Sequence, residues 1–413
     1  MTISLRNCSF VLLLFSVIAY PINYSAGGLR ILDILFFLSV LVSLPFLTLK
    51  RSNLLLVSFF FLVFLLSILS GFVLIGDFNN ERLIFVYKYF YPFALILIFY
   101  NLDLDHTQLN TLLKCMLASH VALVVWVFVY TYLVATGQLY GSFRPSFPFS
   151  NDYIASDAHL YSSVLAIGSL FFTMFFKHMY SSKIVFLIFV LISLTAMLLT
   201  GSRTGILVYI IGMSMYLISL NKRFLPAIFT LICVSTLISI VIIFSDIQIP
   251  DEYVRLVDRI TSTDFSNDSS FLGRIHKLAI GLADSERVYF FIGTGVLHSS
   301  LVWYDSLAGS LMSHVGLLGC TIFFLMLYKL RKNTVHSAQK DKKKAAIFTI
   351  LLICYVIANL ITEYFLVSRS VFPFLVYLFI LHQYIKLENY NSNYWKNDDS
   401  VVVRKNNEVT AVY

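Results

Sequence analysis

The stretch "LLTGSRTGILVYIIG", residues 198–212, places a single arginine between two apolar runs. A guanidinium is costly in hydrocarbon, so Arg203 must lie at a membrane edge, have a partner or serve a function. The flanking runs are typical of the whole chain, which is 59% hydrophobic and 13% charged, whereas a soluble domain carries about 25% charged residues. The composition therefore predicts an integral membrane protein, with Arg203 at the end of a span.

The apolar runs predict an all-α fold of about twelve transmembrane helices. Crossing a bilayer takes roughly 20 residues per helix, and the runs lack the alternation and the short length of barrel strands. A lone spanning segment satisfies its backbone only as a helix. The first run is not followed by an A-x-A-like cleavage site, so we interpret it as a helix and not as a signal peptide. The predicted spans are residues 7–22, 29–49, 53–76, 82–100, 109–136, 158–177, 183–200, 203–220, 224–244, 305–328, 345–367 and 370–386.

Basic residues gather in every second connection between these spans. By the positive-inside rule, those connections and both termini are cytoplasmic. The turn between the spans at 183–200 and 203–220 is then outside, so Arg203 lies at the outer mouth, where Gly201 and Gly205 allow close approach of other groups. The basic residues that set this orientation are Lys50, Arg51, Lys177, Lys183, Lys222, Arg223, the run from Lys329 to Lys344, and Lys386, Lys396, Arg404 and Lys405.

The chain divides into a polytopic membrane domain, residues 1–386, and a polar cytoplasmic tail, residues 387–413. Two outer loops stand out, at about 137–157 and about 245–304. The longer loop contains "PDEYVRLVDRI", which reads as a short helix, and "FLGRIHKLAIGLAD", residues 271–284, whose apolar residues recur at helical spacing. We expect the second segment to be an amphipathic helix at the outer membrane surface.

Arginine is unusually frequent on the predicted outer side. Of 16 lysines, Lys277 alone falls in an outer loop, whereas nine of 14 arginines lie outside or at the outer edge. The planar fork of arginine suits phosphate or carboxylate, so the skew indicates an anionic ligand; exclusion of lysine by the sorting rule is the alternative explanation. The nine arginines are Arg30, Arg82, Arg144, Arg203, Arg255, Arg259, Arg274, Arg287 and Arg369.

The cysteines do not suggest a metal site or a disulfide. They all fall within predicted spans and none has metal-ligand spacing, so we interpret them as packing residues. They are Cys8, Cys115, Cys233, Cys320 and Cys354.

Three segments together resemble the family of integral-membrane O-antigen polymerases and O-antigen ligases. They are "SRTG" at 202–205, "GRIHKLAIGLADSERVYFFIGTG" at 273–295 and "DSLAGSLMSHVGLLG" at 305–319. A weaker similarity covers "FRPSFPFSNDYIASDAHL" at 143–160. The firm part spans about residues 195–320, and the order of the motifs and the single long outer loop agree with the family.

The resemblance implies a glycosyltransferase in a bacterial inner membrane. In this family a glycan on a polyprenyl pyrophosphate, such as undecaprenyl pyrophosphate, is the donor, and a polymerase transfers it on the outer face to a hydroxyl of a second lipid-linked repeat unit. Neither a metal, a cofactor nor a nucleotide sugar is used. The expected partners are lipid-linked repeat units, the membrane and a chain-length regulator protein, with no nucleic acid.

The motif match also implies roles for particular residues. Arg203 and Arg274 would bind the pyrophosphate and stabilise the charge that develops as it leaves. Arg144 is a weaker candidate for pyrophosphate or an acidic sugar, and an ordinary loop arginine is the alternative. Gly293 and Gly295 form the turn of the long loop and are assigned to substrate binding. For Arg203 the alternative is an interfacial arginine that reaches lipid headgroups.

The general base is expected near the entrance to the span at 305–328. We predict Asp305, although the ligases typically place a histidine there, and Asp305 could instead be a helix N-cap. If Asp305 is not the residue that matches the ligase histidine, His298 could be the general base instead. His159 could contact the sugar. His314 is deeper in the span and is expected to pack there with a satisfied hydrogen bond.

Two other functions remain open. The absence of histidine at position 305 favours polymerase, of O-antigen or of another surface polysaccharide, over ligase. A lipid-linked oligosaccharide flippase would also fit twelve spans, but a transporter typically shows paired halves and several mid-membrane charges. Here Asp33 and Lys88 are the main charges within spans, and the halves do not match.

Overall fold

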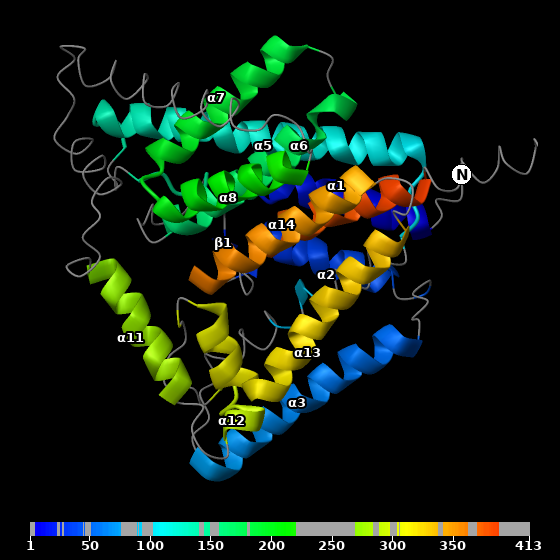
Figure 1. Cartoon of the computed structure of the whole chain (residues 1–413), viewed down its shortest axis with the longest axis vertical. Helices are drawn as coiled ribbons and strands as arrows, with labels where there is room; N and C mark the ends of the chain where they lie inside the picture. Colours follow the sequence, from blue (N-terminus) through cyan, green and yellow to red (C-terminus); the bar gives the residue numbers. More distant parts are fainter. Residues whose placement is uncertain are drawn as a thin grey trace, which may run out of the picture.

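Helices make up nearly all of the described chain in the computed structural model (Figure 1). The exception is a pair of two-residue antiparallel strands, β1 (Ser25–Ala26) and β2 (Leu29–Arg30). The predicted all-α membrane fold is confirmed. The structure describes residues 5–22, 25–26, 29–43, 45, 51–75, 89, 91–92, 102–139, 144–148, 157–179, 182–219, 269–283, 289–297, 304, 306–337, 342–361 and 370–387.

The helices follow the predicted spans closely. Their bounds are α1 Leu5–Ala19, α2 Ile31–Ser43, α3 Arg51–Ile75, α5 His106–Ala135, α6 Asp157–Met179, α7 Lys183–Leu199, α8 Arg203–Ser219, α11 Ser269–Ala283, α12 Tyr289–Ile292, α13 Leu307–Ser337, α14 Lys342–Ile361 and a last helix at Ser370–Leu387. The predicted span at 224–244, the short loop helix and the polar tail lie outside the described residues, as does most of the span at 82–100.

Five of these helices are long and apolar enough to cross a membrane. They are His106–Ala135, Ala158–Phe175, Leu307–Ser337, Lys342–Leu360 and Ser370–Leu387. Several shorter apolar helices accompany them: Asn7–Ala19, Ile31–Ser43, Ser58–Leu69, Ile184–Leu199 and Arg203–Ser219. In one respect the sequence-based bounds were wrong, because α13 continues to Ser337 instead of ending near residue 328. Most of the added residues are polar or basic, but lysine and arginine are good helix formers.

Helix α6 lies at the centre of the packing, and its apolar stretch Ala158–Phe175 is 94% buried. It packs against α8, α7, α14 and α5. Glycines bring α6 and α8 together, because a Cβ added at Gly205 would lie 1.9 Å from Oγ of Ser162 and one at Gly212 would lie 2.6 Å from Leu170. Small residues at such crossings allow the dense backbone packing on which helix association in lipid depends. These glycines therefore set the register of α6 against α8.

Helix α13 is broken at Gly316, whose φ of 60° and ψ of −169° are not helical. The turn after α12 packs into the break. Both the backbone N–H and the hydroxyl of Thr294 donate to the Ser313 carbonyl, at 2.7 and 3.0 Å. Carbonyls at a helix end need such partners. The long outer loop is thereby joined to α13.

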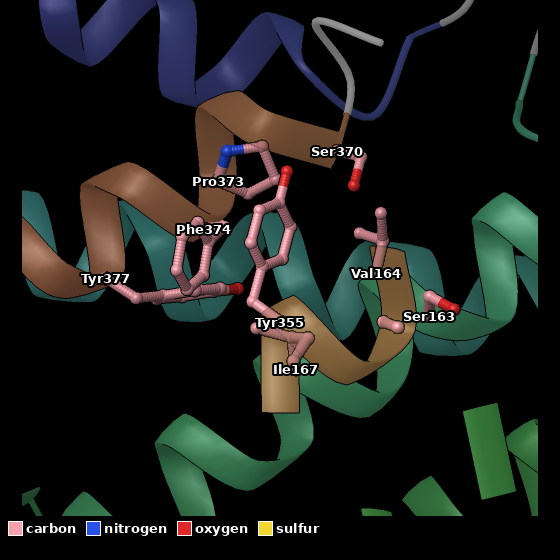
Figure 2. Close-up of a pocket in the computed structure, with 9 residues that line it drawn as sticks. Ser163, Val164, Ile167, Tyr355, Ser370, Pro373, Phe374 and Tyr377 are labelled. Carbon is pink, nitrogen blue, oxygen red and sulfur yellow. The ribbon is translucent and has the colours of Figure 1, made fainter. Parts of the chain in front are cut away.

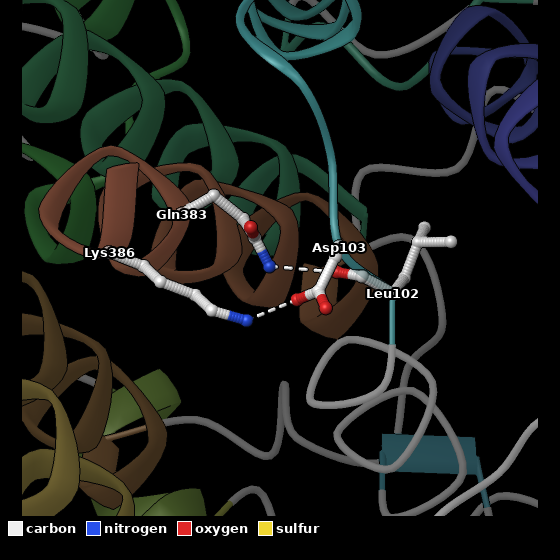
Figure 3. A network of polar contacts seen from close by, with 4 residues as sticks. All are labelled: Leu102, Asp103, Gln383 and Lys386. Atoms are coloured by element: carbon white, nitrogen blue, oxygen red, sulfur yellow. Dashed lines mark hydrogen bonds and ion pairs between the residues drawn. The ribbon is translucent and has the colours of Figure 1, made fainter. Parts of the chain in front are cut away.

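A polar cluster links the end of the last helix to the segment that precedes α5 (Figure 3). Lys386 forms an ion pair with Asp103, and Nε2 of the buried Gln383 donates to the Leu102 carbonyl at 2.8 Å. Both contacts join residues that are far apart in the sequence. This end of the bundle is the one predicted to face the cytoplasm.

Candidate functional site

Arg144 and His159 meet the turn that precedes Arg203. Nε of Arg144 donates to the Thr200 carbonyl at 3.4 Å, and its Nη2 lies 3.5 and 3.4 Å from the two ring nitrogens of His159. Nδ1 of His159 lies 3.1 Å from Oγ of Ser202. We call Arg144, His159, Ser202 and Arg203 the mouth cluster.

The turn between α7 and α8 shapes one side of the mouth cluster. Gly201 has φ of 61°, a backbone conformation that other residues rarely adopt, and it reverses the chain directly after Thr200. The Ser202 N–H bonds back to Oγ1 of Thr200 at 3.4 Å. Both Thr200 and Ser202 are fully buried, and α8 begins at the next residue, Arg203. The polar groups of this turn are therefore held rigidly.

The segment that carries Arg144 is tied to α5 and α6. Nε1 of Trp126 in α5 donates to the Ser146 carbonyl at 2.9 Å. The buried ring of Phe147 lies edge-on to Tyr161 of α6, with centroids 4.8 Å apart. These contacts hold Arg144 over the first turn of α6, where His159 is located.

The mouth cluster is half-buried and contains two arginines. Arg144, His159 and Arg203 are all partly exposed, while Nη1 of Arg203 is buried. One guanidinium nitrogen of Arg144 is almost equidistant from the two His159 nitrogens, so it lies beside the ring and is not aimed at a single lone pair. Two guanidinium groups in a partly desolvated site favour an anionic ligand.

Arg274 belongs to a second group, on the predicted amphipathic helix of the outer loop, which the structure confirms as α11. Arg274, Lys277 and Gly281 are spaced i, i+3 and i+7, so they share one face. A Cβ at Gly281 would lie 2.8 Å from Tyr304 and 3.0 Å from Gly309, so this face turns toward the start of α13. Among the described residues, Arg274 makes no hydrogen bond to the mouth cluster.

The opposite face of α11 is apolar and exposed. Leu272, Ile275 and Leu282 are each almost half exposed. Arg274 and Lys277 are half-buried on the protein side.

The two glycines assigned to substrate binding pack against backbone. Gly293 and Gly295 have φ of 75° and 83°. A Cβ at Gly293 would lie 2.6 Å from the Val315 nitrogen, and one at Gly295 would lie 2.7 Å from the Ser67 carbonyl of α3. The structure therefore explains glycine at these positions by the close approach of α13 and α3.

The expected bases Asp305 and His298 lie outside the described residues. Their neighbour Tyr304 is buried, and its hydroxyl lies 2.9 Å from Oγ of Ser313. The expectation for His314 is confirmed, since it is fully buried with Nδ1 2.7 Å from the Tyr89 hydroxyl.

A small pocket lies between α6, α14 and the last helix (Figure 2). Ser163 lines it, one turn below His159 on α6, and Tyr355 stacks on Phe374 at 3.6 Å beside it. It has space for about one water molecule. A sugar ring does not fit there, so the mouth cluster is the better candidate for substrate contact.

Sequence reasoning missed the cluster member Ser202 and its neighbour in the turn, Thr200. Both flank Gly201 in the stretch that marked Arg203, so their place in that polar turn was the available signal. No group of three or more His, Cys, Asp or Glu side chains suited to a metal occurs in the described part of the chain.

Comparison with protein families supports the resemblance noted from the sequence. The family described as O-antigen ligase matches residues 187–306, a range that includes Arg203 and Arg274. The match confirms similarity to the O-antigen polymerase and ligase family over this segment and supports a polymerase- or ligase-type glycosyl transfer in general. A search of curated proteins found no match.

Proposed function

We propose that this protein polymerises lipid-linked oligosaccharide repeat units into O-antigen or a related surface polysaccharide. The donor would be a glycan on undecaprenyl pyrophosphate, and transfer would occur without a metal on the outer face of the bacterial inner membrane. The observation that carries the proposal is the convergence of Arg144 and His159, at 3.1 to 3.5 Å, on the turn Thr200–Ser202 that precedes Arg203, partly inside the family-matched segment.

The chemistry of the leaving group explains the arginines. When the acceptor oxygen attacks the anomeric carbon, the bond to the pyrophosphate breaks and negative charge develops on its oxygens. Fixed guanidinium groups stabilise that charge more than they stabilise the ground state. Arg203 and Arg144 would do this at the mouth cluster, and Arg274 from α11. Removal of one such donor typically costs about 10²–10³ in rate.

The orientation belongs to the same proposal. Lys386 lies at one end of the bundle, and the positive-inside rule, applied to the basic connections in the sequence, assigns that end to the cytoplasm. The mouth cluster and α11 would then face outward, where lipid-linked repeat units are available. Both termini would be cytoplasmic.

A lipopolysaccharide gel from a deletion strain tests the proposal. Wild type, Arg203→Ala and Arg331→Ala are reintroduced at equal protein level. Arg331 is the matched control, because it contacts Thr349 near the predicted cytoplasmic end, at 3.2 Å. We expect wild type and Arg331→Ala to restore the ladder, while Arg203→Ala leaves one repeat unit on the core.

The gel also separates the alternatives. Ligase is the second candidate, because the matching family is described as O-antigen ligase. It predicts a bare core in the deletion strain, with polymer still held on the lipid carrier. An unchanged ladder in the deletion strain would contradict a role in O-antigen assembly, whether as polymerase or as ligase.

A further inference from the structure

We infer that His159 accepts the proton of the acceptor hydroxyl and that the Ser202 hydroxyl positions its ring. The inference rests on the proposed function and adds two roles to it: a catalytic base other than Asp305, and a positioning residue in the turn between α7 and α8. It follows from three observations on the mouth cluster: the contact at Nδ1, the rigidity of the two helices and the placement of Arg144.

The contact between Ser202 and His159 fixes the orientation of the ring. Oγ of Ser202 lies 3.1 Å from Nδ1. Ser202 is fully buried, and its N–H bonds to Thr200, so its hydroxyl is held in place. A hydrogen bond at one ring nitrogen determines which tautomer and which direction the other nitrogen has. With Nδ1–H donating to Ser202, Nε2 carries the lone pair.

The helices make this contact rigid. His159 lies in the first turn of α6, whose following residues are almost all buried. One turn further along each helix, Ser162 of α6 meets Gly205 of α8, with room for no side chain at position 205. The His159–Ser202 pair and the Ser162–Gly205 pair are therefore successive contacts of one crossing. A base held by two packed helices keeps the geometry that proton transfer requires.

Arg144 connects the base to the substrate. Its Nη2 lies 3.4 Å from Nε2 and 3.5 Å from Nδ1 of His159. Phosphate oxygens bind guanidinium more strongly than a neutral imidazole does, because both partners are charged. Binding of the donor would draw the guanidinium to the pyrophosphate and leave Nε2 to the acceptor hydroxyl.

The step balances as follows. The acceptor O–H proton passes to Nε2 of His159 while the oxygen forms a bond to the anomeric carbon. The bond between that carbon and the pyrophosphate oxygen breaks, and its electron pair leaves with the pyrophosphate. The proton on His159 then passes to water. Imidazole suits this role because its ordinary pKa, about 6.5, is close to the working pH.

The test uses the purified full-length protein and lipid-linked repeat units extracted from the deletion strain. The variants are His159→Ala, Ser202→Ala, Ser202→Thr and Asp305→Asn. The matched controls are His276→Ala, an exposed histidine of α11, and Ser163→Ala, a buried serine one turn below His159. The measured quantities are kcat and KM for the extracted units, with and without added imidazole.

We expect His159→Ala to lower kcat by about 100-fold or more, with KM unchanged, and added imidazole to restore part of it. Ser202→Ala should lower kcat by about 10- to 100-fold through a misplaced ring, and Ser202→Thr should recover most of the loss. Both controls should keep wild-type kinetics.

Three results would overturn the inference. The first is a kcat of His159→Ala within about threefold of the wild-type value. The second is a loss of activity in His159→Ala that appears as a raised KM and is not restored by imidazole. The third is a loss of activity confined to Asp305→Asn. Each leaves the proposed function standing, because that depends on transfer by wild type and its loss in Arg203→Ala. Absence of any transfer by wild type would instead contradict the proposed function.

Discussion

At the residue scale, Gly205 decides how closely α6 and α8 approach beside the mouth cluster. A Cβ there would meet both the hydroxyl of Ser162, at 1.9 Å, and its carbonyl oxygen, at 2.7 Å. The hydroxyl could rotate away, but the backbone carbonyl of α6 could not. Packing therefore explains the glycine of "SRTG".

We predict that Gly205→Ala destabilises the protein by about 1–3 kcal/mol, because α6 and α8 must separate. Gly273→Ala on α11 is the control, since nothing lies within 4 Å of its Cβ position and alanine is the better helix former. The measurement is the thermal unfolding midpoint in detergent. Equal midpoints for the two variants would contradict the packing role of Gly205.

Two polar contacts at the other end of the bundle should differ in strength. Gln383→Leu leaves the Leu102 carbonyl without its donor and should cost about 1–3 kcal/mol. Asp103→Asn should cost under about 1 kcal/mol, because the side chains of Lys386 and Asp103 are about half exposed, at 54% and 50%. Chemical denaturation of both variants checks the order. A larger loss for Asp103→Asn would show that the ion pair is the stronger contact.

The sequence predicted the location of Arg203 at a helix end, because charge alternates between successive connections. It did not predict that Arg144 and His159 lie beside Ser202, because that contact depends on how α5, α6 and α8 pack. Gly293 and Gly295 were assigned to substrate, whereas the neighbours they meet are the backbones of α13 and α3. Spacing along a chain does not reveal which backbone will approach a glycine.

At the element scale, the break in α13 joins the long outer loop to the bundle. Gly316 has a conformation that is nearly restricted to glycine, and a Cβ there would lie 2.5 Å from the backbone of residues 291–293. This break could not be predicted from the sequence, because Gly316 lies inside an apolar run that is typical of a continuous helix.

We predict that Gly316→Ala combines backbone strain of about 1–3 kcal/mol with displacement of the turn at Thr294. Gly137→Ala is the matched control, because Gly137 also has positive φ, 69°, but nothing within 4 Å. Thermal unfolding and limited proteolysis of the outer loop are the readouts. If both variants lose equal stability and the loop stays protected, the break does not anchor the loop.

The amphipathic helix α11 was predicted from apolar spacing, and the structure supplies its orientation. We expect lipid to cover the face with Ile275. In intact membranes, a charged maleimide should then label Gly273→Cys, which is exposed on the polar edge, and spare Ile275→Cys. Equal labelling would show that this face contacts water. Labelling from the outer side alone also tests the proposed orientation.

At the scale of the whole molecule, hydrophobic run length predicted most of the architecture. A span needs about 20 apolar residues whatever it packs against, so α5, α6 and α14 could be located without knowledge of their neighbours. The end of α13 was missed because the helix continues past the apolar run into basic residues. Which helices pack together and which distant loops come into contact depend on the tertiary structure, so they cannot be predicted from any single segment.

The most direct test of the central claim is polymerisation by the purified protein in proteoliposomes. Lipid-linked repeat units from the deletion strain are added to wild type, Arg203→Ala or Arg203→Lys, and the lipid-linked products are resolved by size. The account predicts a ladder with wild type, none with Arg203→Ala, and at most a weak ladder with Arg203→Lys, because lysine lacks the planar fork. A full ladder with Arg203→Ala, or single repeat units alone with wild type, would contradict it.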